Sequence, residues 1–244
     1  MRILLTISYL GTRYHGWQVQ QNAVTVQETV QDAIERITGI RSDLTGCSRT
    51  DAGVHALAYC CAFSPEKPLD LTTLGKALNA VLPDDIAVRS VKEVPENFHP
   101  RYSAKGKAYR YRIYNAPDRD PFETGRALHR REPLDLPLMR QAAKHFLGTH
   151  DFAAFMASGS SITDTVRTVT SLDITKEGNV VTVRIAADGF LYNMVRIIVG
   201  TLLAVNDGKI QADAIPAILS SLDRANAGPT APAEGLYLEQ VFYD

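Results

Sequence analysis

Residues 25–39 of the chain read TVQETVQDAIERITG, and this stretch predicts an amphipathic helix. Thr25 and Glu28 have the spacing of a capping box, which satisfies backbone N–H groups at a helix start, and Gly39 is suited to end the helix. Between them, apolar residues recur every three or four positions and form one face. Because the opposite face is polar, we expect this helix to pack on a β-sheet.

The segments on either side of this helix predict strands. Residues 2–10 alternate apolar with smaller or polar residues, and residues 57–63 form an apolar run. A second helix is expected at about 72–81, with further strands at 86–94 and 108–114. The first half therefore reads strand, helix, strand, helix, strand.

A second unit is predicted after the Pro-rich, charged passage from Asn115 to Pro133. The sequence Glu177-Gly178-Asn179 is a hairpin signal, and Ser158–Ser161 predicts a loop. We expect the following elements in order: a helix at 135–146, strands at 170–175 and 180–186, helices at 191–205 and about 213–222, and a strand at 236–242.

These elements predict an α+β fold, because strands of antiparallel type occur together with segregated helices. Helices should cover one face of each sheet. We expect an N-terminal half at residues 1–103 and a C-terminal half at residues 104–244, the core of which is about 135–244. An open sheet face between the halves would form a cleft.

Composition narrows the class of protein. The chain has 244 residues, of which 45% are hydrophobic, as in globular proteins with a real core. No apolar stretch approaches the roughly 20 residues that span a bilayer, and the N-terminus is strand-like, so we expect a cytoplasmic protein. Cys47, Cys60 and Cys61 match no metal spacing, and we expect neither a metal site nor a disulfide.

Positive charge is unevenly distributed along the chain, although the formal net charge is only −1. A basic segment without an intervening acid contains interleaved tyrosines, and a second basic group follows it. The residues are Arg101, Tyr102, Lys105, Lys107, Tyr109, Arg110, Tyr111 and Arg112, then Arg126, Arg130 and Arg131. Such residues can simply solvate a strand, but their mixture with aromatic rings favours a surface for RNA, contacted by Arg101, Lys105 and Arg110.

The run Arg49-Thr50-Asp51-Ala52-Gly53-Val54-His55 connects the first helix to the next strand. Asp-Ala-Gly is good turn chemistry, so Asp51 should lie on a tight bend. Two interpretations are open. Asp51 could cap a turn and pair with Arg49 on the surface, or it could be an ionised carboxylate that acts as a nucleophile.

The string from Gly46 to Ala56 closely resembles the catalytic motif of the tRNA pseudouridine synthase A family. Further stretches resemble the motifs of this family in the same order along the chain. They are Tyr14–Gln18, Phe98–Ala104, Tyr109–Tyr111, Gly189–Arg196 and Glu234–Leu238. The resemblance therefore extends from the first predicted strand to the last.

The resemblance implies two ferredoxin-like (RRM-like) halves with joined, mainly antiparallel sheets and an active site between them. It implies isomerisation of uridine to pseudouridine at positions 38, 39 and 40 of the tRNA anticodon stem-loop, by a homodimer that requires no cofactor. An alternative is a non-catalytic RNA-binding module or RNA chaperone with the same fold. The two differ in whether the carboxylate of Asp51 is essential.

The resemblance also implies roles for single residues. Asp51 would be the catalytic carboxylate, paired with Arg196, and Arg49 would aid displacement of the target nucleotide. Tyr109 would stack on the target uracil, and Leu236 would line the pocket. Three routes stay open for the carboxylate: attack on ribose C1′, attack on uracil C6, or assistance in removing the C2′ proton.

Three further residues of the matched motifs have expected roles. We expect His55 to hold the motif loop by hydrogen bonding rather than to transfer a proton. Tyr14 and Trp17 could form a wall of the substrate site, or they could belong to the core.

Overall fold

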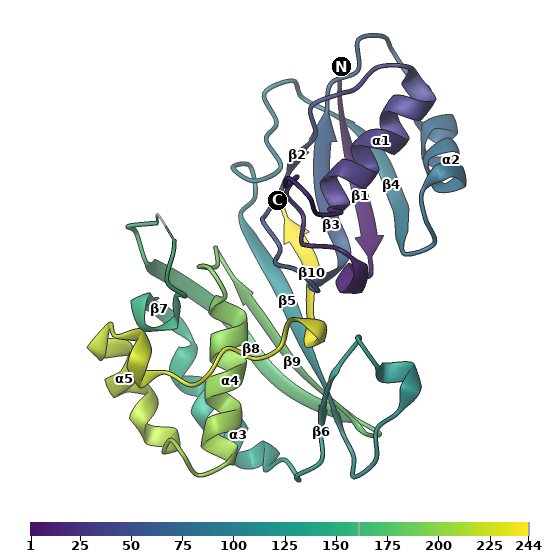
Figure 1. Cartoon of the computed structure of the whole chain (residues 1–244). Helices are drawn as coiled ribbons and strands as arrows, with labels where there is room; N and C mark the ends of the chain where they lie inside the picture. Colours follow the sequence, from purple (N-terminus) through teal and green to yellow (C-terminus); the bar gives the residue numbers. More distant parts are fainter. Residues whose placement is uncertain (161, 244) are drawn as a thin grey trace. The chain divides into compact units, whose positions relative to one another are not determined.

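The computed structural model describes residues 1–160 and 162–243, which fold as two units (Figure 1). Unit 1 comprises residues 1–105 together with the C-terminal strand from Tyr237 onward, and unit 2 comprises Gly106–Leu236. Helices and mostly antiparallel strands are present in the chain, so the predicted α+β class is confirmed.

The division of the chain into halves at residue 103 stays a prediction, and so does a cleft between them. In the structure, the last strand of the predicted C-terminal half lies in unit 1. The predicted loop Ser158–Ser161 includes Ser161, which lies outside the described residues. None of the helices in the described part of the chain has the length and apolar character of a membrane-spanning segment.

The sheet of unit 1 has the strand order β4-β1-β3-β10, and β2 pairs with β3. β1 is antiparallel to both β3 and β4, whereas β10 runs parallel to β3. Helices α1 and α2 lie on one face of this sheet (Figure 1). The bounds are β1 Arg2–Tyr9, α1 Val26–Thr38, β2 Thr45–Gly46, β3 His55–Phe63, α2 Leu71–Val81, β4 Ile86–Val94 and β10 Leu236–Phe242.

Helix α1 forms as its sequence predicts. The hydroxyl of Thr25 accepts a hydrogen bond from the backbone N–H of Glu28 at 3.4 Å. Gly39 follows the last turn with a φ of 75°, a left-handed conformation that suits glycine. Val26 and Ile34 are among the residues that its apolar face buries, and α1 lies on a face of the unit 1 sheet (Figure 1), so the predicted packing is confirmed.

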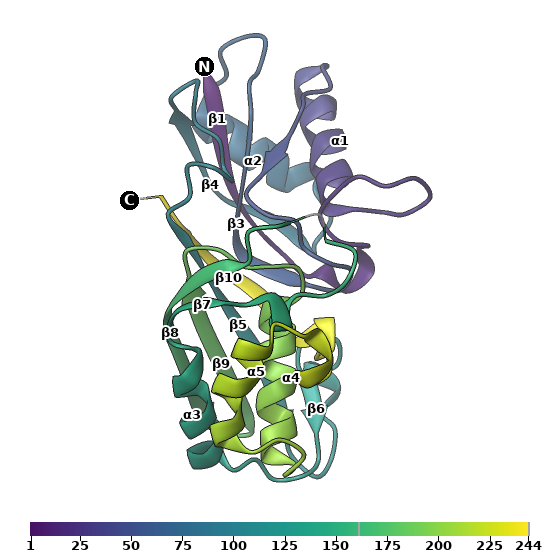
Figure 2. The same cartoon turned by 90° about the vertical axis from the view of Figure 1, so that its left-hand side faces the viewer.

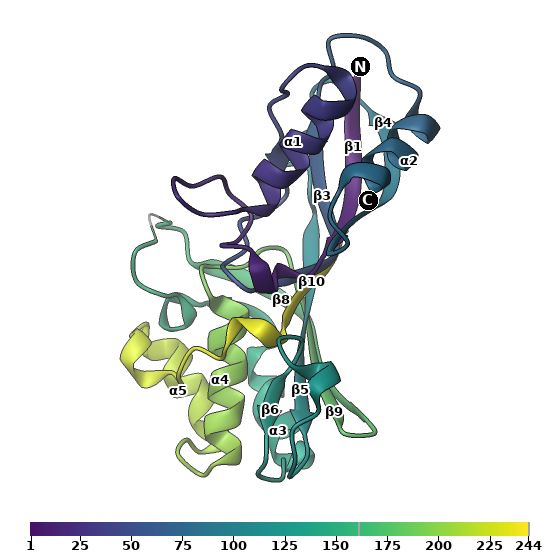
Figure 3. The same ribbon diagram turned by 45° about the vertical axis from the view of Figure 1, so that its right-hand side comes forward.

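The sheet of unit 2 has the strand order β5-β9-β8-β7, and β6 runs parallel to β5. Figure 3 shows α4 and α5 on one side of β5 and β9, and Figure 2 shows α3 beside them. The bounds are β5 Gly106–Asn115, β6 Leu128–Arg130, α3 Leu136–Ala143, β7 Gly148–Asp151, β8 Val166–Glu177, β9 Val180–Ala187, α4 Met194–Asn206 and α5 Ile215–Ser221. Short 3-10 turns occupy Gly11–Arg13, Pro121–Glu123, Lys144–Phe146, Ala153–Phe155, Ala212–Ala214, Arg224–Asn226 and Ala233–Gly235.

Some element boundaries differ from the prediction. Helix α4 begins at Met194 instead of Leu191, because Asn193 has a φ of 59° and a left-handed residue cannot continue a right-handed helix. Strand β3 begins at His55, two residues before the predicted start, and this places the histidine of the motif inside the sheet.

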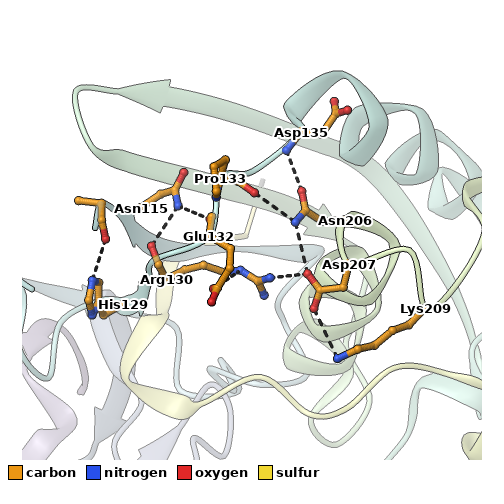
Figure 4. A network of polar contacts seen from close by, with 10 residues as sticks. Asn115, His129, Arg130, Glu132, Pro133, Asp135, Asn206, Asp207 and Lys209 are labelled. Atoms are coloured by element: carbon orange, nitrogen blue, oxygen red, sulfur yellow. Dashed lines mark hydrogen bonds and ion pairs between the residues drawn. The ribbon is translucent and has the colours of Figure 1, made fainter. Parts of the chain in front are cut away.

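A polar network fastens the passage between β5 and α3 to the end of α4 (Figure 4). The Arg130 guanidinium donates to the carboxylate of Asp207, and the Asn206 side chain accepts from the backbone N–H of Asp135 at 2.7 Å. The Asn115 side chain donates to the carbonyl of Arg130 at 3.0 Å. Arg130 was expected on a basic surface, but its guanidinium forms an ion pair with Asp207 within unit 2.

Candidate active site

Asp51 lies on the tight turn that the sequence predicts. The backbone N–H of Val54 donates to the carbonyl of Asp51 at 3.2 Å, which closes the turn. Gly53 has a φ of 79°, a value that favours glycine at this position of a turn. Asp51 is half-buried, so its carboxylate is held on a defined backbone at the border between core and solvent.

A second segment, the brace (residues 11–17), holds this turn through backbone hydrogen bonds. The N–H of Gly53 donates to the carbonyl of Tyr14 at 3.2 Å, and the N–H of Trp17 donates to the carbonyl of Thr50 at 3.1 Å. These two bonds lie on opposite sides of the carboxylate in the chain. The turn is therefore fixed before and after its acidic residue.

Glycines allow the brace to approach the turn closely. Gly16 has a φ of 88°, and a Cβ atom there would lie 2.3 Å from the carbonyl oxygen of Thr50. A Cβ atom on Gly11 would lie 1.9 Å from the carbonyl oxygen of Val54. Any larger residue at either position would push the brace and the turn apart.

His55 links the brace to the sheet. It is fully buried, and its Nδ1 accepts a hydrogen bond from the backbone N–H of Gly11 at 2.9 Å. Because Nδ1 is the acceptor, this bond requires that nitrogen to carry no proton. The ring lies 4.5 Å from the ring of Tyr237 in β10. The expectation that His55 holds the motif loop by hydrogen bonding is confirmed.

Aromatic residues support the turn from inside unit 1. Trp17 is only 3% exposed and stacks on Tyr59 at a centroid distance of 4.1 Å, and the Tyr59 hydroxyl donates to the carbonyl of Ser48. Tyr14 is also buried, and its hydroxyl donates to Asp85 at 2.7 Å. Burial and this hydrogen bond raise the pKa of Tyr14. Trp17 and Tyr14 thus belong to the core of unit 1, and a substrate wall formed by them stays a prediction.

Arg49 is exposed at the start of the motif. Within residues 1–160 and 162–243, its side chain forms no ion pair, so the surface pairing with Asp51 that the local sequence allowed is absent. Among the residues that the structure describes, the exposed guanidinium therefore has no acidic partner.

In unit 2, two hydrogen bonds fix the guanidinium of Arg196. Its Nε donates to the carbonyl of Ala231 at 2.7 Å, and one terminal nitrogen donates to the side chain of Asn193 at 2.8 Å. The resemblance did not indicate a role for Asn193. The spacing of three residues at a helix start was the available signal, because such residues lie on the same side of a helix.

Tyr109 and Tyr111 lie on the same side of β5, because alternate residues of a strand share a face. Tyr109 is 6% exposed and packs edge-on against Phe190 at 4.9 Å. The Tyr111 hydroxyl donates to the carbonyl of Pro232 at 2.7 Å. Burial raises the pKa of Tyr111, although the nearby positive charge of Arg196 opposes this shift. Tyr111 is thus a neighbour of Arg196 that the sequence did not identify.

Leu236 is buried at the start of β10. The residue before it, Gly235, packs against Tyr111 so closely that a Cβ atom there would lie 2.6 Å from the ring. This contact explains why position 235 is a glycine. It also places the backbone that precedes Leu236 next to Tyr111.

Within β5, the predicted arginines lie on the face of the strand opposite to that of the two tyrosines. Arg110 lies on the opposite side of β5 from Tyr109, where it faces Arg184 of β9 in the strand register. Arg112 pairs with Glu123 at 2.9 Å. A ligand group that contacts the ring of Tyr109 and a ligand group that contacts Arg110 therefore lie on opposite faces of β5.

Arg101 and Lys105 belong to unit 1, and both are exposed. The backbone N–H of Lys105 donates to the carbonyl of Phe242 in β10 at 2.8 Å. This bond anchors the backbone and leaves the charged side chain in solvent. The substrate contacts expected of both residues stay predictions.

The predicted site residues are thus divided between the two units. Unit 1 carries Arg49, Asp51, Arg101 and Lys105, and unit 2 carries Tyr109, Arg110, Arg196 and Leu236. Backbone hydrogen bonds join the turn of Asp51 to the brace, and the positive charge of Arg196 lowers the pKa of Tyr111 against the effect of burial. The pairing of Asp51 with Arg196 stays a prediction.

Comparison with known proteins relates both units to one family. A family model described as tRNA pseudouridine synthase matches residues 5–103 and 142–244. The chain is 52% identical over 241 residues to "tRNA pseudouridine synthase A" of Acetivibrio thermocellus and 48% identical over 243 residues to that of Ruminiclostridium cellulolyticum. Each alignment covers 99% of both chains. The matched ranges contain Asp51 and Arg196, whereas Tyr109 and Arg110 lie between them.

Proposed function

This chain belongs to the tRNA pseudouridine synthase family, and we propose that it isomerises uridine to pseudouridine at positions 38, 39 and 40 of the tRNA anticodon stem-loop. We assign the catalytic carboxylate to Asp51. The observation that carries this assignment is the braced turn: Asp51 is half-buried on a turn whose backbone is held by hydrogen bonds on both sides of it.

The reaction breaks the bond between ribose C1′ and uracil N1, turns the base, and joins it again through C5. The C5–H bond breaks and its proton leaves to solvent, while N1 gains a proton. The product has the same atoms as the substrate, so the overall change needs no external oxidant or reductant. Asp51 could attack C1′ or C6, or assist removal of the C2′ proton, and each route uses the ionised carboxylate. A carboxylate that is already in place costs little reorganisation when the reaction occurs.

We assign Arg196 as the partner of Asp51. A positive charge in the first turn of a helix is unfavourable, because the helix N-terminus is itself positive. Arg196 is nevertheless the third residue of α4, and Asn193 and Ala231 hold its guanidinium there. Since this location does not help the helix, it supports a role in binding a negative group.

Arg49 and Tyr109 are assigned to the nucleotide that reacts. A uridine in a stem must leave its stack, which costs a few kcal/mol that protein contacts offset. The exposed guanidinium of Arg49, which has no acidic partner among the described residues, is suited to the space that the base leaves. Tyr109 would stack on the displaced uracil, and because its ring is largely covered, the uracil must replace a neighbour.

The rest of the tRNA would contact basic side chains. The deep, narrow major groove of A-form RNA hides base edges, so recognition rests on shape, phosphates and 2′-hydroxyls. We assign phosphate contacts to Arg101, Lys105 and Arg110. Lys105→Ala should reduce the slope of log Kd against log salt by about 1, and an unchanged slope would place the phosphate elsewhere.

A homodimer located in the cytoplasm is part of the same proposal. An elongated tRNA suits a site that extends over two copies of the chain. Sedimentation of the free protein and of its tRNA complex should show two chains per particle, and a single chain in both would contradict this part.

The test of the function uses unmodified tRNA transcripts. The protein is incubated with them, and pseudouridine is mapped by chemical sequencing. Product at positions 38, 39 and 40 is expected. Product confined to other positions would reject the proposed specificity, and tRNA binding without any product would support a non-catalytic RNA-binding module.

A further inference from the structure

Tyr102 is an aromatic side chain of unit 1 that points into solvent. It is 76% exposed and lies between β4 and β5. A single exposed apolar side chain is ordinary on a protein surface. What distinguishes Tyr102 is how firmly its backbone is held and which side chains adjoin its ring.

A closed turn of backbone carries Tyr102. The N–H of Ser103 donates to the carbonyl of His99 at 2.9 Å, and the Ser103 hydroxyl accepts from the N–H of His99 at 3.1 Å. The Nδ1 of His99 accepts from the N–H groups of Arg101 and Tyr102, at 3.1 Å and 3.3 Å. This reciprocal arrangement resembles a capping box. It gives the backbone N–H groups of His99, Arg101, Tyr102 and Ser103 acceptors within the turn itself.

The base of this turn is attached to the core of unit 1. Pro100 is buried, and its carbonyl accepts a hydrogen bond from the Tyr243 hydroxyl at 2.9 Å. The ring of Tyr243 packs against Phe98 at 5.0 Å. Burial raises the pKa of Tyr243, so its hydroxyl remains a donor. The exposed ring of Tyr102 is thus presented by a rigid support.

The neighbours of Tyr102 are aromatic and cationic. The imidazole of His99 lies 4.3 Å from its ring, at an angle of 39°, and the guanidinium carbon of Arg101 lies 5.7 Å from its centroid. Lys105 is exposed three residues further along. Exposed aromatic rings accompanied by arginine and lysine are the combination with which proteins bind unpaired nucleobases and the adjoining phosphates.

We propose that the turn from His99 to Ser103 is a stacking site for one unpaired tRNA base other than the uridine that reacts. Tyr102 supplies the stacking surface, and Arg101 and Lys105 supply charge for the adjacent phosphates. The inference rests on the proposed function, since that function makes tRNA the substrate. It adds a second base contact, supported by contacts within unit 1 alone.

Two substitutions separate stacking from other roles of the side chain. Within the described residues the Tyr102 hydroxyl makes no hydrogen bond, so Tyr102→Phe keeps the stacking surface and Tyr102→Ala removes it. Tyr102→Ala should raise the Kd for tRNA about tenfold with an unchanged salt slope, and Tyr102→Phe should stay within about twofold of the wild type. Equal weakening by both variants, or none by Tyr102→Ala, would overturn the inference.

A direct optical signal comes from Tyr102→Trp. The chain has one tryptophan, the buried Trp17, so a new exposed tryptophan dominates the change in fluorescence when tRNA is added. Stacking should quench it. Unquenched emission in a variant that binds tRNA would overturn the inference and leave the proposed function intact. A wild-type protein that neither binds tRNA nor forms pseudouridine would overturn both.

Discussion

Replacement of His55 tests whether the brace positions the catalytic turn. His55→Leu removes the acceptor for the N–H of Gly11 but retains an apolar side chain, whereas His55→Asn places an amide oxygen close to where Nδ1 lies. A buried N–H left without an acceptor costs about 1–3 kcal/mol. Loss of the ring contact with Tyr237 costs about 0.5–1.5 kcal/mol in both variants. His55→Leu should therefore be less stable than His55→Asn by about 1–3 kcal/mol.

The same comparison predicts activity. Because the brace holds the turn at Thr50 and Gly53, its displacement moves the carboxylate of Asp51. A shift of about 1 Å at a reacting group can cost about a hundredfold in rate. His55→Leu should lower kcat for pseudouridine formation by about ten- to a hundredfold while the Kd for tRNA changes little. His55→Asn should recover most of kcat.

The assays are denaturant unfolding, release of tritium from C5-labelled uridine in tRNA, and fluorescence of Trp17. This residue is the single tryptophan of the chain and belongs to the brace, so its emission reports on the displacement directly. It should change in His55→Leu and remain as in the wild type in His55→Asn. Equal loss of kcat in both variants with unchanged emission would refute the positioning role and indicate a chemical role for the imidazole.

Two further predictions concern the brace and the network of unit 2. Gly16→Ala and Gly39→Ala both place a methyl group at a residue with positive φ. Only the methyl group at position 16 collides with neighbouring backbone, that of Thr50. The kcat should therefore fall in Gly16→Ala and stay near wild type in Gly39→Ala. Burial tends to raise the pKa of Asp207, but hydrogen bonds from Arg130 and Asn206 outweigh it and lower this pKa below its ordinary 3.8. The ionised form thus stabilises the fold above about pH 4, and this stability is lost as the pH falls through the lowered pKa. In denaturant unfolding, the difference in free energy between wild type and Asp207→Asn should shrink on acidification, and a constant difference would contradict this assignment.

The sequence predicts elements whose signals are local. Thr25, Glu28 and Gly39 delimit α1 because capping depends on residues within one helical turn. The turn at Asp51 is predicted for the same reason, since Ala52 and Gly53 are its central residues. These features need no knowledge of distant contacts.

The features that the sequence did not predict depend on pairs far apart in the chain. The brace contacts the turn across more than thirty positions, and nothing in Tyr14 or Trp17 alone indicates the backbone bonds that they make to Gly53 and Thr50. Arg130 was predicted on a surface for RNA because its acidic partner is remote in sequence. That partner, Asp207, lies 77 positions later in the chain.

Short strands were missed for a related reason. Strand β6 has three residues and β7 has four, too few for a period of two to be recognised. Each is instead fixed by its neighbour: β6 pairs with β5, and β7 pairs with β8. Helix α4 is shorter than predicted because Asn193 has a left-handed conformation. The apolar periodicity of the sequence does not show this backbone conformation.

Asp51→Asn tests the central claim most directly. The substitution keeps the shape of the side chain and removes its charge, and it leaves the backbone bonds of the turn in place. With C5-labelled tRNA, the wild type should release tritium, while the variant should release none above the enzyme-free control and still bind tRNA within about twofold of the wild-type Kd. Tritium release by Asp51→Asn at the wild-type rate would show that this carboxylate is not the catalytic group.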